Sequence, residues 1–169
     1  MTSDLLIVPT DPFRPEAMAL VEQMWDELSL IYVKNQGPCL FKPEDVQGPR
    51  SVFLVAWLAG LPVGCAAVRP LQEERTATGG KSPTGEIGEV KRVFVKNDVR
   101  GRRIGRRLME QIAKEARRLG YGMLRLETGI LQADAIRLYR RIGYQTCTCW
   151  GHYAGDPESI CFELRLTGE

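Results

Sequence analysis

An arginine-rich stretch punctuated by glycine constrains the fold of this 169-residue chain more than any other feature. It reads Arg-Gly-Arg-Arg-Ile-Gly-Arg-Arg-Leu over residues 100–108, between an apolar run at residues 93–95 and a segment patterned as a helix. Backbone N–H groups are unpaired at the start of a helix, and the helix dipole favours anions there. The spacing matches neither a Walker phosphate loop nor the dinucleotide-binding glycine pattern. We therefore expect a phosphate-binding turn of another kind, the alternative being an ordinary basic helix start.

Hydrophobic periodicity predicts the other elements of the chain. Apolar residues at helical spacing predict helices over residues 15–30, 102–119 and 133–142. Runs of β-branched and apolar residues predict strands over residues 5–8, 52–58, 62–71, 86–95, 123–128, 144–150 and 160–166. The polar segment 72–85 is expected to be a surface loop. This order predicts a mixed α/β sheet in one domain that covers residues 1–169.

Composition argues against several classes of protein. The net charge of +2 gives no overall basic character for nucleic-acid binding, and the apolar runs are too short to span a bilayer. The five cysteines lie at scattered spacings, which predicts free thiols in a reducing compartment, with a metal or redox role for Cys147 and Cys149 as the alternative. A single histidine argues against a metal site. We therefore expect a cytoplasmic protein that uses no metal, nucleic acid or membrane.

Two motifs resemble those of the GNAT N-acetyltransferases. Residues 100–105 resemble motif A of the family, Gln/Arg-x-x-Gly-x-Gly/Ala, with Arg103 where the first glycine is usual. Residues 126–144 resemble motif B, which often has an asparagine where this chain has Gln132 and shares the tyrosine at Tyr139. Arg103 still offers its backbone N–H, so phosphate binding is expected to be retained. The resemblance is specific over residues 52–143 and rests on the order of elements elsewhere.

The resemblance implies the acyl-CoA N-acyltransferase fold, with a mostly antiparallel sheet flanked by helices in a single domain. It also implies acetyl-CoA as cosubstrate and direct attack of a primary amine on its acetyl group. The cofactor-binding residues that it implies are Val93, Phe94, Val95, Arg100, Gly101, Arg102, Arg103, Ile104, Gly105, Arg106 and Gln132. Among them, the backbone N–H groups of Val93 and Val95 would contact the pantetheine arm, and that of Val93 the thioester oxygen.

Two side chains are candidates for proton transfer. Tyr139 occupies the position from which family members with this tyrosine are thought to protonate the coenzyme A sulfur, although an aromatic ring at helical spacing also fits a core position. Glu89 matches in spacing the glutamate base of the histone-acetylating branch of the family. Glu86 or an ordered water is the alternative proton route.

The sequence leaves the acceptor open. The residues expected on the acceptor side are Trp25, Tyr32, Trp150, His152, Tyr153, Asp156 and Glu158. The acids among them favour a cation, which suggests that the acceptor is a small amine, an amino acid or a peptide amine. We expect the protein to be a monomer or a homodimer. A catalytically idle acyl-CoA sensor would use the same phosphate turn. A nucleic-acid binding module is disfavoured because aromatic residues are not interleaved with the arginines.

Overall fold

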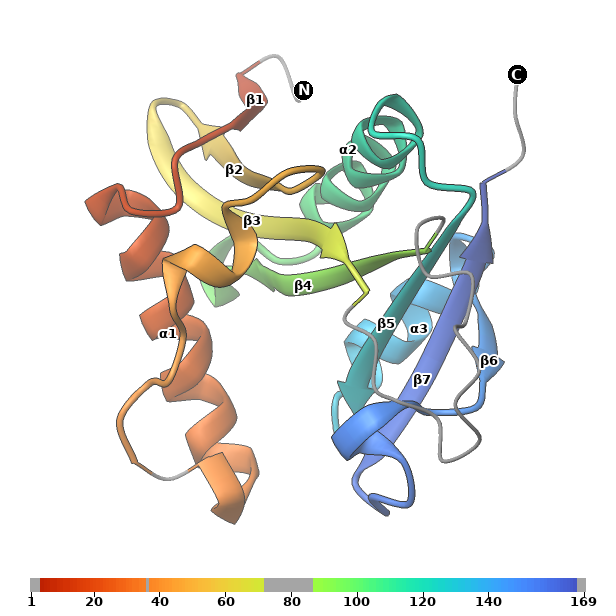
Figure 1. Cartoon of the computed structure of the whole chain (residues 1–169). Coiled ribbons are helices and arrows are strands. Elements are labelled where there is room, and N and C mark those ends of the chain that lie inside the picture. The colour runs from red at the N-terminus through yellow and green to blue at the C-terminus, as the bar shows by residue number, and fades with distance from the viewer. Residues whose placement is uncertain (1–3, 36, 72–86, 167–169) are drawn as a thin grey trace. The chain divides into compact units, whose positions relative to one another are not determined.

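The computed structural model describes residues 4–35, 37–71 and 87–166. Its strands are β1 (Leu5–Pro9), β2 (Val52–Leu58), β3 (Leu61–Pro70), β4 (Ile87–Val95), β5 (Met123–Gly129), β6 (Gln145–Cys147) and β7 (Ser159–Arg165), and its α-helices are α1 (Pro15–Ile31), α2 (Ile104–Arg118) and α3 (Ala133–Arg141) (Figure 1). Short 3-10 helices occur at Val33–Asn35, Pro43–Val46, Asn97–Val99 and Gly151–Tyr153. The strands of the described residues are hydrogen-bonded in the order β1-β2-β3-β4-β5-β7-β6. β4 and β5 pair in parallel, whereas β1 with β2, β2 with β3, and β7 with both β5 and β6 pair antiparallel. The predicted mixed, mostly antiparallel α/β fold is confirmed.

The predicted strands and helices are all present, and their ends differ by a few residues. The strand predicted over residues 144–150 is the short β6, because the chain turns after Cys147 toward the 3-10 helix Gly151–Tyr153. Helix α2 begins at Ile104 instead of residue 102, because Arg103 has a left-handed backbone (φ 62°) that a right-handed helix cannot include. The loop predicted over residues 72–85 lies outside the described residues.

The chain folds into two compact units. The first unit comprises Met1–Arg69 with Lys91–Ile112, and the second comprises Pro70–Val90 with Ala113–Glu169. Strand β4 therefore begins in the second unit and ends in the first, and helix α2 runs from the first into the second. The prediction of one domain over residues 1–169 stays a prediction.

The core of the first unit lies between α1 and the strands β2 and β3. Proline at the first helical position starts α1, and its residues Ala17, Leu20, Val21 and Met24 recur at helical spacing and are buried. They belong to one cluster with Val46, Phe53, Val55, Cys65, Ala67 and Phe94. Burial of a side chain the size of leucine stabilises a fold by about 1.5–3 kcal/mol. Through Phe94, this packing holds the end of β4 against the core of the unit.

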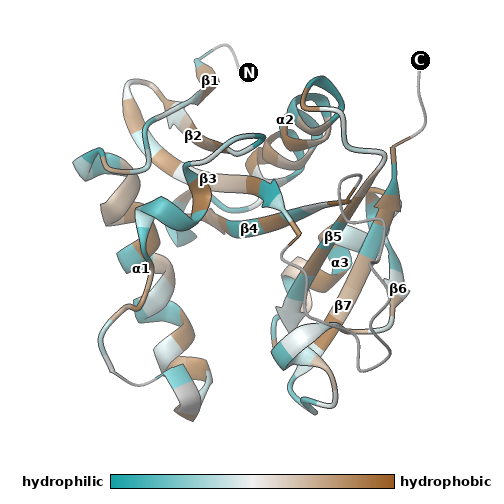
Figure 2. Ribbon diagram, viewed as in Figure 1, coloured by the Kyte–Doolittle hydropathy of each residue, from teal (hydrophilic) through white to brown (hydrophobic). Residues whose placement is uncertain are grey.

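In the second unit, β5 and β7 present one apolar face and one polar face. Half-buried and buried residues alternate along β5 from Met123 to Thr128, and the strand carries both hydrophobic and hydrophilic residues (Figure 2). Leu126 pairs in register with Phe162, and the Phe162 ring contacts that of Tyr139 on α3, with centroids 5.9 Å apart. Arg125 and Glu127 alternate with Leu126, so they lie on the opposite face of the sheet. Helix α3 therefore covers the apolar face.

A disulfide joins Cys149 and Cys161 in the second unit. The prediction of free thiols is therefore wrong for these two cysteines and holds for Cys39, Cys65 and Cys147. The pairing arises because the chain beyond β6 turns back beside β7 and brings the two Cα atoms within 5.2 Å. The predicted cytoplasmic location stays a prediction, and disulfides are more typical of oxidising compartments.

Candidate acetyl-coenzyme A site

The turn that leads from β4 into α2 has the backbone of an anion-binding site. After the 3-10 helix Asn97–Val99, Gly101 (φ 83°) and Arg103 (φ 62°) both take left-handed conformations, and α2 starts at the next residue. The first turn of α2 carries no acidic residue. Its unpaired N–H groups and its dipole therefore face only neutral and basic neighbours in sequence, which is the arrangement that favours a phosphate.

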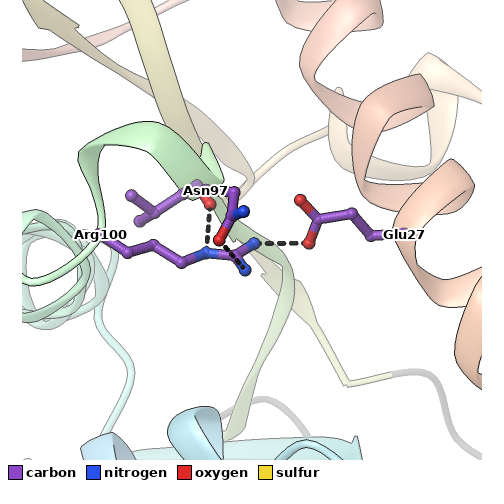
Figure 3. Close-up of polar contacts among 4 residues, drawn as sticks. Glu27, Asn97 and Arg100 are labelled. Carbon is purple, nitrogen blue, oxygen red and sulfur yellow. Dashed lines mark hydrogen bonds and ion pairs between the residues drawn. The ribbon is translucent and has the colours of Figure 1, made fainter.

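The arginines of this turn differ in what their side chains contact. Arg100 is engaged within the protein, because its Nε donates to the carbonyl oxygen of Val95 (2.9 Å) and its Nη2 pairs with Glu27 (2.5 Å) (Figure 3). Arg106 pairs with a glutamate one helical turn later, at 2.8 Å. Within the described part of the chain, the guanidinium groups of Arg102 and Arg103 have no ion-pair partner, and both residues are exposed. Arg102 and Arg103 are therefore the side chains open to phosphate oxygens, and Arg100 is not.

The end of β4 has an unusual backbone next to the predicted pantetheine contacts. Arg92 takes a left-handed conformation (φ 57°) inside the strand, a strained geometry that concentrates at functional sites. Its carbonyl oxygen accepts a hydrogen bond from the buried thiol of Cys65, 3.2 Å away. Val93 and Val95 are half-buried, whereas Phe94 is buried. The irregularity falls directly before Val93, whose N–H is the candidate donor to the thioester oxygen.

Glu89 is a buried carboxylate, with 4% of its surface exposed, near the start of β4. It pairs in register with Arg125 of β5, so both side chains lie on the polar face of the second unit. Arg125 also forms an ion pair with Glu163 (3.4 Å). Tyr139 packs on the other face of the sheet, so the structure does not bring the two candidate proton-transfer residues to one face. The alternative base Glu86 lies outside the described residues.

Tyr139 lies on α3 with 4% of its surface exposed, between the rings of Tyr144 (centroid distance 5.8 Å) and Phe162. Burial raises the pKa of its phenol above the ordinary value, and the negative charge of Glu127 raises that pKa further. The hydroxyl therefore stays protonated across the physiological range. The ring packs in the core, as its helical spacing predicts. The same burial keeps the hydroxyl protonated, which is the form that a general acid requires.

Glu127 lies near the end of β5, and Gln132 lies at the start of α3. Gln132 precedes α3 as its N-cap residue, and its side chain makes no capping hydrogen bond, so its amide is not committed to the helix. Glu127 accepts a hydrogen bond from the hydroxyl of Ser159 on β7, at 2.7 Å. This contact anchors Glu127 to the neighbouring strand.

Several predicted acceptor-side residues have structural partners. The indole N–H of Trp25 donates to the carbonyl oxygen of Gly37 (2.9 Å), and Tyr32 is 3% exposed. In the second unit, the ring of Tyr153 contacts those of Trp150 and His152, with centroids 5.9 and 4.0 Å away. The acceptor-side role of these residues stays a prediction.

Three residues near the phosphate turn have roles that the motif comparison missed: Gly64, Glu27 and Asn97. A Cβ atom at Gly64 would lie 2.7 Å from the carbonyl oxygen of Phe94, so glycine lets β3 approach the end of β4 closely. A lone glycine inside a strand pattern is a recognised sign of such an approach. Glu27 and Asn97 both contact the Arg100 side chain, and no local pattern in the sequence indicates these contacts.

The described residues contain no cluster of three or more His, Cys, Asp or Glu side chains that could hold a metal. In the same part of the chain, every helix is too short or too polar to cross a membrane.

Relatives and solved structures resemble this chain along nearly its whole length. An IAA acetyltransferase of Azospirillum brasilense is 36% identical over 163 residues, covering 96% of this chain and 99% of the relative. The crystal structure of a protein of Klebsiella pneumoniae, described as a candidate acyl-CoA N-acyltransferase, is 32% identical with a TM-score of 0.74, covering 96% of this chain and 98% of that one. A candidate acetyltransferase of Salmonella typhimurium, solved with acetyl-CoA, shares the fold at 17% identity with a TM-score of 0.72, covering 99% of this chain and 96% of that one.

The profile of the Acetyltransferase (GNAT) domain matches residues 49–146, more than half of the chain. This range contains β4, the phosphate turn, α2 and α3, the elements that carry both motifs. The chain therefore belongs to the GNAT acetyltransferase family.

Proposed function

We propose that this protein transfers an acetyl group from acetyl-CoA to a primary amine by direct attack. The observation that carries the proposal is the turn between β4 and α2. There, two left-handed residues precede a helix start with no acidic neighbour, and Arg102 and Arg103 have no ion-pair partner among the described residues. Membership of an acetyltransferase family supports the same conclusion.

In this proposal, the phosphates of acetyl-CoA bind the backbone N–H groups from Gly101 to Arg106, together with the side chains of Arg102 and Arg103. The N–H groups of Val93 and Val95 bind the pantetheine arm in this proposal, and the amide of Gln132 is a further proposed contact to it. Phe94 and Ile104 are buried and hold these segments in place. Arg100 contributes through its contacts within the turn, and Gly105 through its backbone N–H in the first turn of α2. The solved relatives that contain acetyl-CoA support this choice of cosubstrate.

The chemical step requires a base, an oxyanion donor and an acid. The amine nitrogen attacks the thioester carbonyl carbon, the C–N bond forms, and the C–S bond breaks to release coenzyme A. The N–H of Val93 stabilises the developing oxyanion. Tyr139 donates a proton to the leaving sulfur, and Glu89, which lies on the opposite face of the sheet, accepts the proton of the amine through a water. Glu86 or ordered water is the alternative base.

The acceptor is proposed to be a primary amine of a small molecule, an amino acid or a peptide. The ring cluster of Trp150, His152 and Tyr153 supports an acceptor with an apolar body, and Arg125 lies over the Trp150 ring at 5.9 Å. Asp156 accepts a hydrogen bond from the backbone N–H of Glu158 (2.9 Å), so it shapes the turn before β7. Its fixed charge supports a cationic acceptor.

The proposal is tested by measuring thiol release from acetyl-CoA in the presence of an acceptor panel. The panel contains polyamines, amino acids, lysine peptides and aminoglycosides, with IAA and an aminoalkylphosphonate included because relatives are named for them. Acetylated product and amine-dependent thiol release are expected. Binding of acetyl-CoA without turnover on any acceptor would instead favour an acyl-CoA sensor, and absence of binding would overturn the proposal.

A further inference from the structure

We propose that Glu27 on α1 is a positioning residue for acetyl-CoA, acting through Arg100. The inference rests on the proposed function and extends it to a helix that neither GNAT motif contains. All of its contacts lie within the first unit. Figure 3 shows the carboxylate of Glu27 facing the guanidinium of Arg100, which lies between it and the end of β4.

The Arg100 side chain joins the two segments that would bind the cofactor. Its Nε donates to the carbonyl oxygen of Val95 (2.9 Å), and its Nη1 donates to the side-chain oxygen of Asn97 (3.4 Å). Its guanidinium carbon lies 5.8 Å from the centre of the Phe94 ring. The side chain thus bridges the end of β4 and the residue that opens the phosphate turn. The distance between the pantetheine-binding N–H groups and the phosphate-binding N–H groups depends on this bridge.

Glu27 completes the bridge from the other side. Its carboxylate lies 2.5 Å from Nη2 of Arg100, and both side chains are about two-fifths exposed (39% and 40%). Because the guanidinium is a rigid planar fork, holding Nη2 fixes the direction of the other two nitrogens. Without Glu27, the guanidinium keeps the hydrogen bond from Nε to Val95 and the longer one from Nη1 to Asn97 (3.4 Å), so the Arg100 side chain is held less firmly. The pair therefore orders a turn whose backbone carries the binding function.

A competing interpretation assigns Glu27 the opposite effect. If Arg100 bound a phosphate directly, Glu27 would compete with the ligand for the guanidinium, and removing its charge would tighten binding. The two interpretations predict changes of opposite sign for one substitution, so a single titration separates them.

The experiment compares Glu27→Gln with Glu16→Gln by calorimetric titration of acetyl-CoA. Glu16 is a matched control because it lies on the same helix and pairs with Arg14 on the surface at 3.2 Å. Positioning predicts that Glu27→Gln raises the Kd about three- to fivefold, whereas the control changes it less than about twofold. Glu27→Asp should lie between Glu27→Gln and the wild type. An unchanged or lowered Kd in Glu27→Gln would overturn the proposal.

A second measurement needs no ligand and so separates this proposal from the proposed function. Backbone amide exchange of Val99 and Arg100, whose N–H groups donate to the carbonyl oxygens of Lys96 and Asn97, should be about three- to fivefold faster in Glu27→Gln than in the wild type and unaltered in Glu16→Gln. If the wild type bound no acetyl-CoA, the proposed function would fail while this measurement still tested the bridge. Equal exchange in both variants would overturn the role of Glu27.

Discussion

The phosphate turn of the first unit and the Tyr139 environment of the second unit carry function in different ways. In the turn, backbone geometry is the proposed binding element, and even the non-glycine Arg103 adopts the left-handed conformation (φ 62°). Around Tyr139, a single hydroxyl is the proposed functional group, and burial between two rings keeps it protonated. Phosphate binding in the turn would be distributed over several N–H groups, so one substitution removes only part of it. Proton donation would depend on the single hydroxyl of Tyr139. Substitutions in the second unit should therefore have the larger effects.

The largest effect is expected from Tyr139→Phe, which keeps the packed ring and removes only the hydroxyl. If Tyr139 is the acid, turnover should fall between about 10²- and 10⁴-fold with little change in acetyl-CoA affinity. Because its pKa is raised by burial, Tyr139 itself should cause no loss of activity on the alkaline side below about pH 10. Steady-state rates from pH 6 to 10 and a titration of acetyl-CoA check these points. Normal turnover in the Phe variant would show that Tyr139 has no catalytic role and serves only to pack the core.

A smaller effect, about 10²-fold on kcat/KM, is expected from Glu89→Gln. A protonated base cannot accept a proton, so activity of the wild type should decline toward acid pH, and the variant should lose or shift that decline. The measurement is a pH profile of kcat/KM, with circular dichroism to establish folding, because Glu89 is buried. An unchanged acidic decline would favour Glu86 or ordered water.

Loss of the disulfide tests the stability of the second unit. Cross-linking two cysteines 12 residues apart should stabilise the fold by about 2–3 kcal/mol, because it restricts the unfolded chain. Cys149→Ser should lower the free energy of unfolding by this amount, and reductant should destabilise the wild type equally. Denaturant unfolding of both proteins under reducing conditions should then coincide. A wild type insensitive to reductant would show that the bond does not form in solution.

In the first unit, phosphate recognition should be shared among several groups. Dephospho-CoA should bind about tenfold more weakly than CoA, because a charge-assisted hydrogen bond contributes about 1.5–3 kcal/mol and solvent can replace part of it. Arg102→Ala should reduce this difference, whereas Arg117→Ala, in the last turn of α2, should not. Calorimetry of both ligands with the three proteins measures the effect. Equal affinity for the two ligands would mean that these arginines do not contact the 3′-phosphate.

The smallest effect concerns the backbone of the turn. Arg103→Gly should raise the free energy of unfolding by up to about 1 kcal/mol, since glycine relieves the left-handed strain but loses more chain entropy on folding. Arg102→Gly is the control: Arg102 is not among the residues with positive φ, so only the entropy loss applies and the protein should be destabilised. Thermal and denaturant unfolding check the signs. Equal destabilisation by both substitutions would show that the strain at Arg103 is negligible.

The sequence by itself predicted the elements and the phosphate turn because their signals are local. Helical spacing along α1 and α3, alternation along β5 and the glycines of the turn each act over a few residues, and these elements are present in the structure. Two elements differ from the prediction for local physical reasons. Helix α2 starts later than predicted because Arg103 has a left-handed backbone, and β6 is shorter because the chain leaves the strand after Cys147. The roles of Tyr139 and Glu89 stay predictions, because a motif names a residue without describing its surroundings.

Contacts distant in the sequence were decided only by the tertiary structure. The pairing of Arg100 with Glu27 spans 73 residues, and only the packing of α1 places that carboxylate beside the turn. The disulfide depends on how the chain folds back beside β7, and the opposite faces of Tyr139 and Glu89 depend on strand register. Local patterns cannot encode such distances, because many chain paths connect the same two residues and the free energy of the whole core selects one of them.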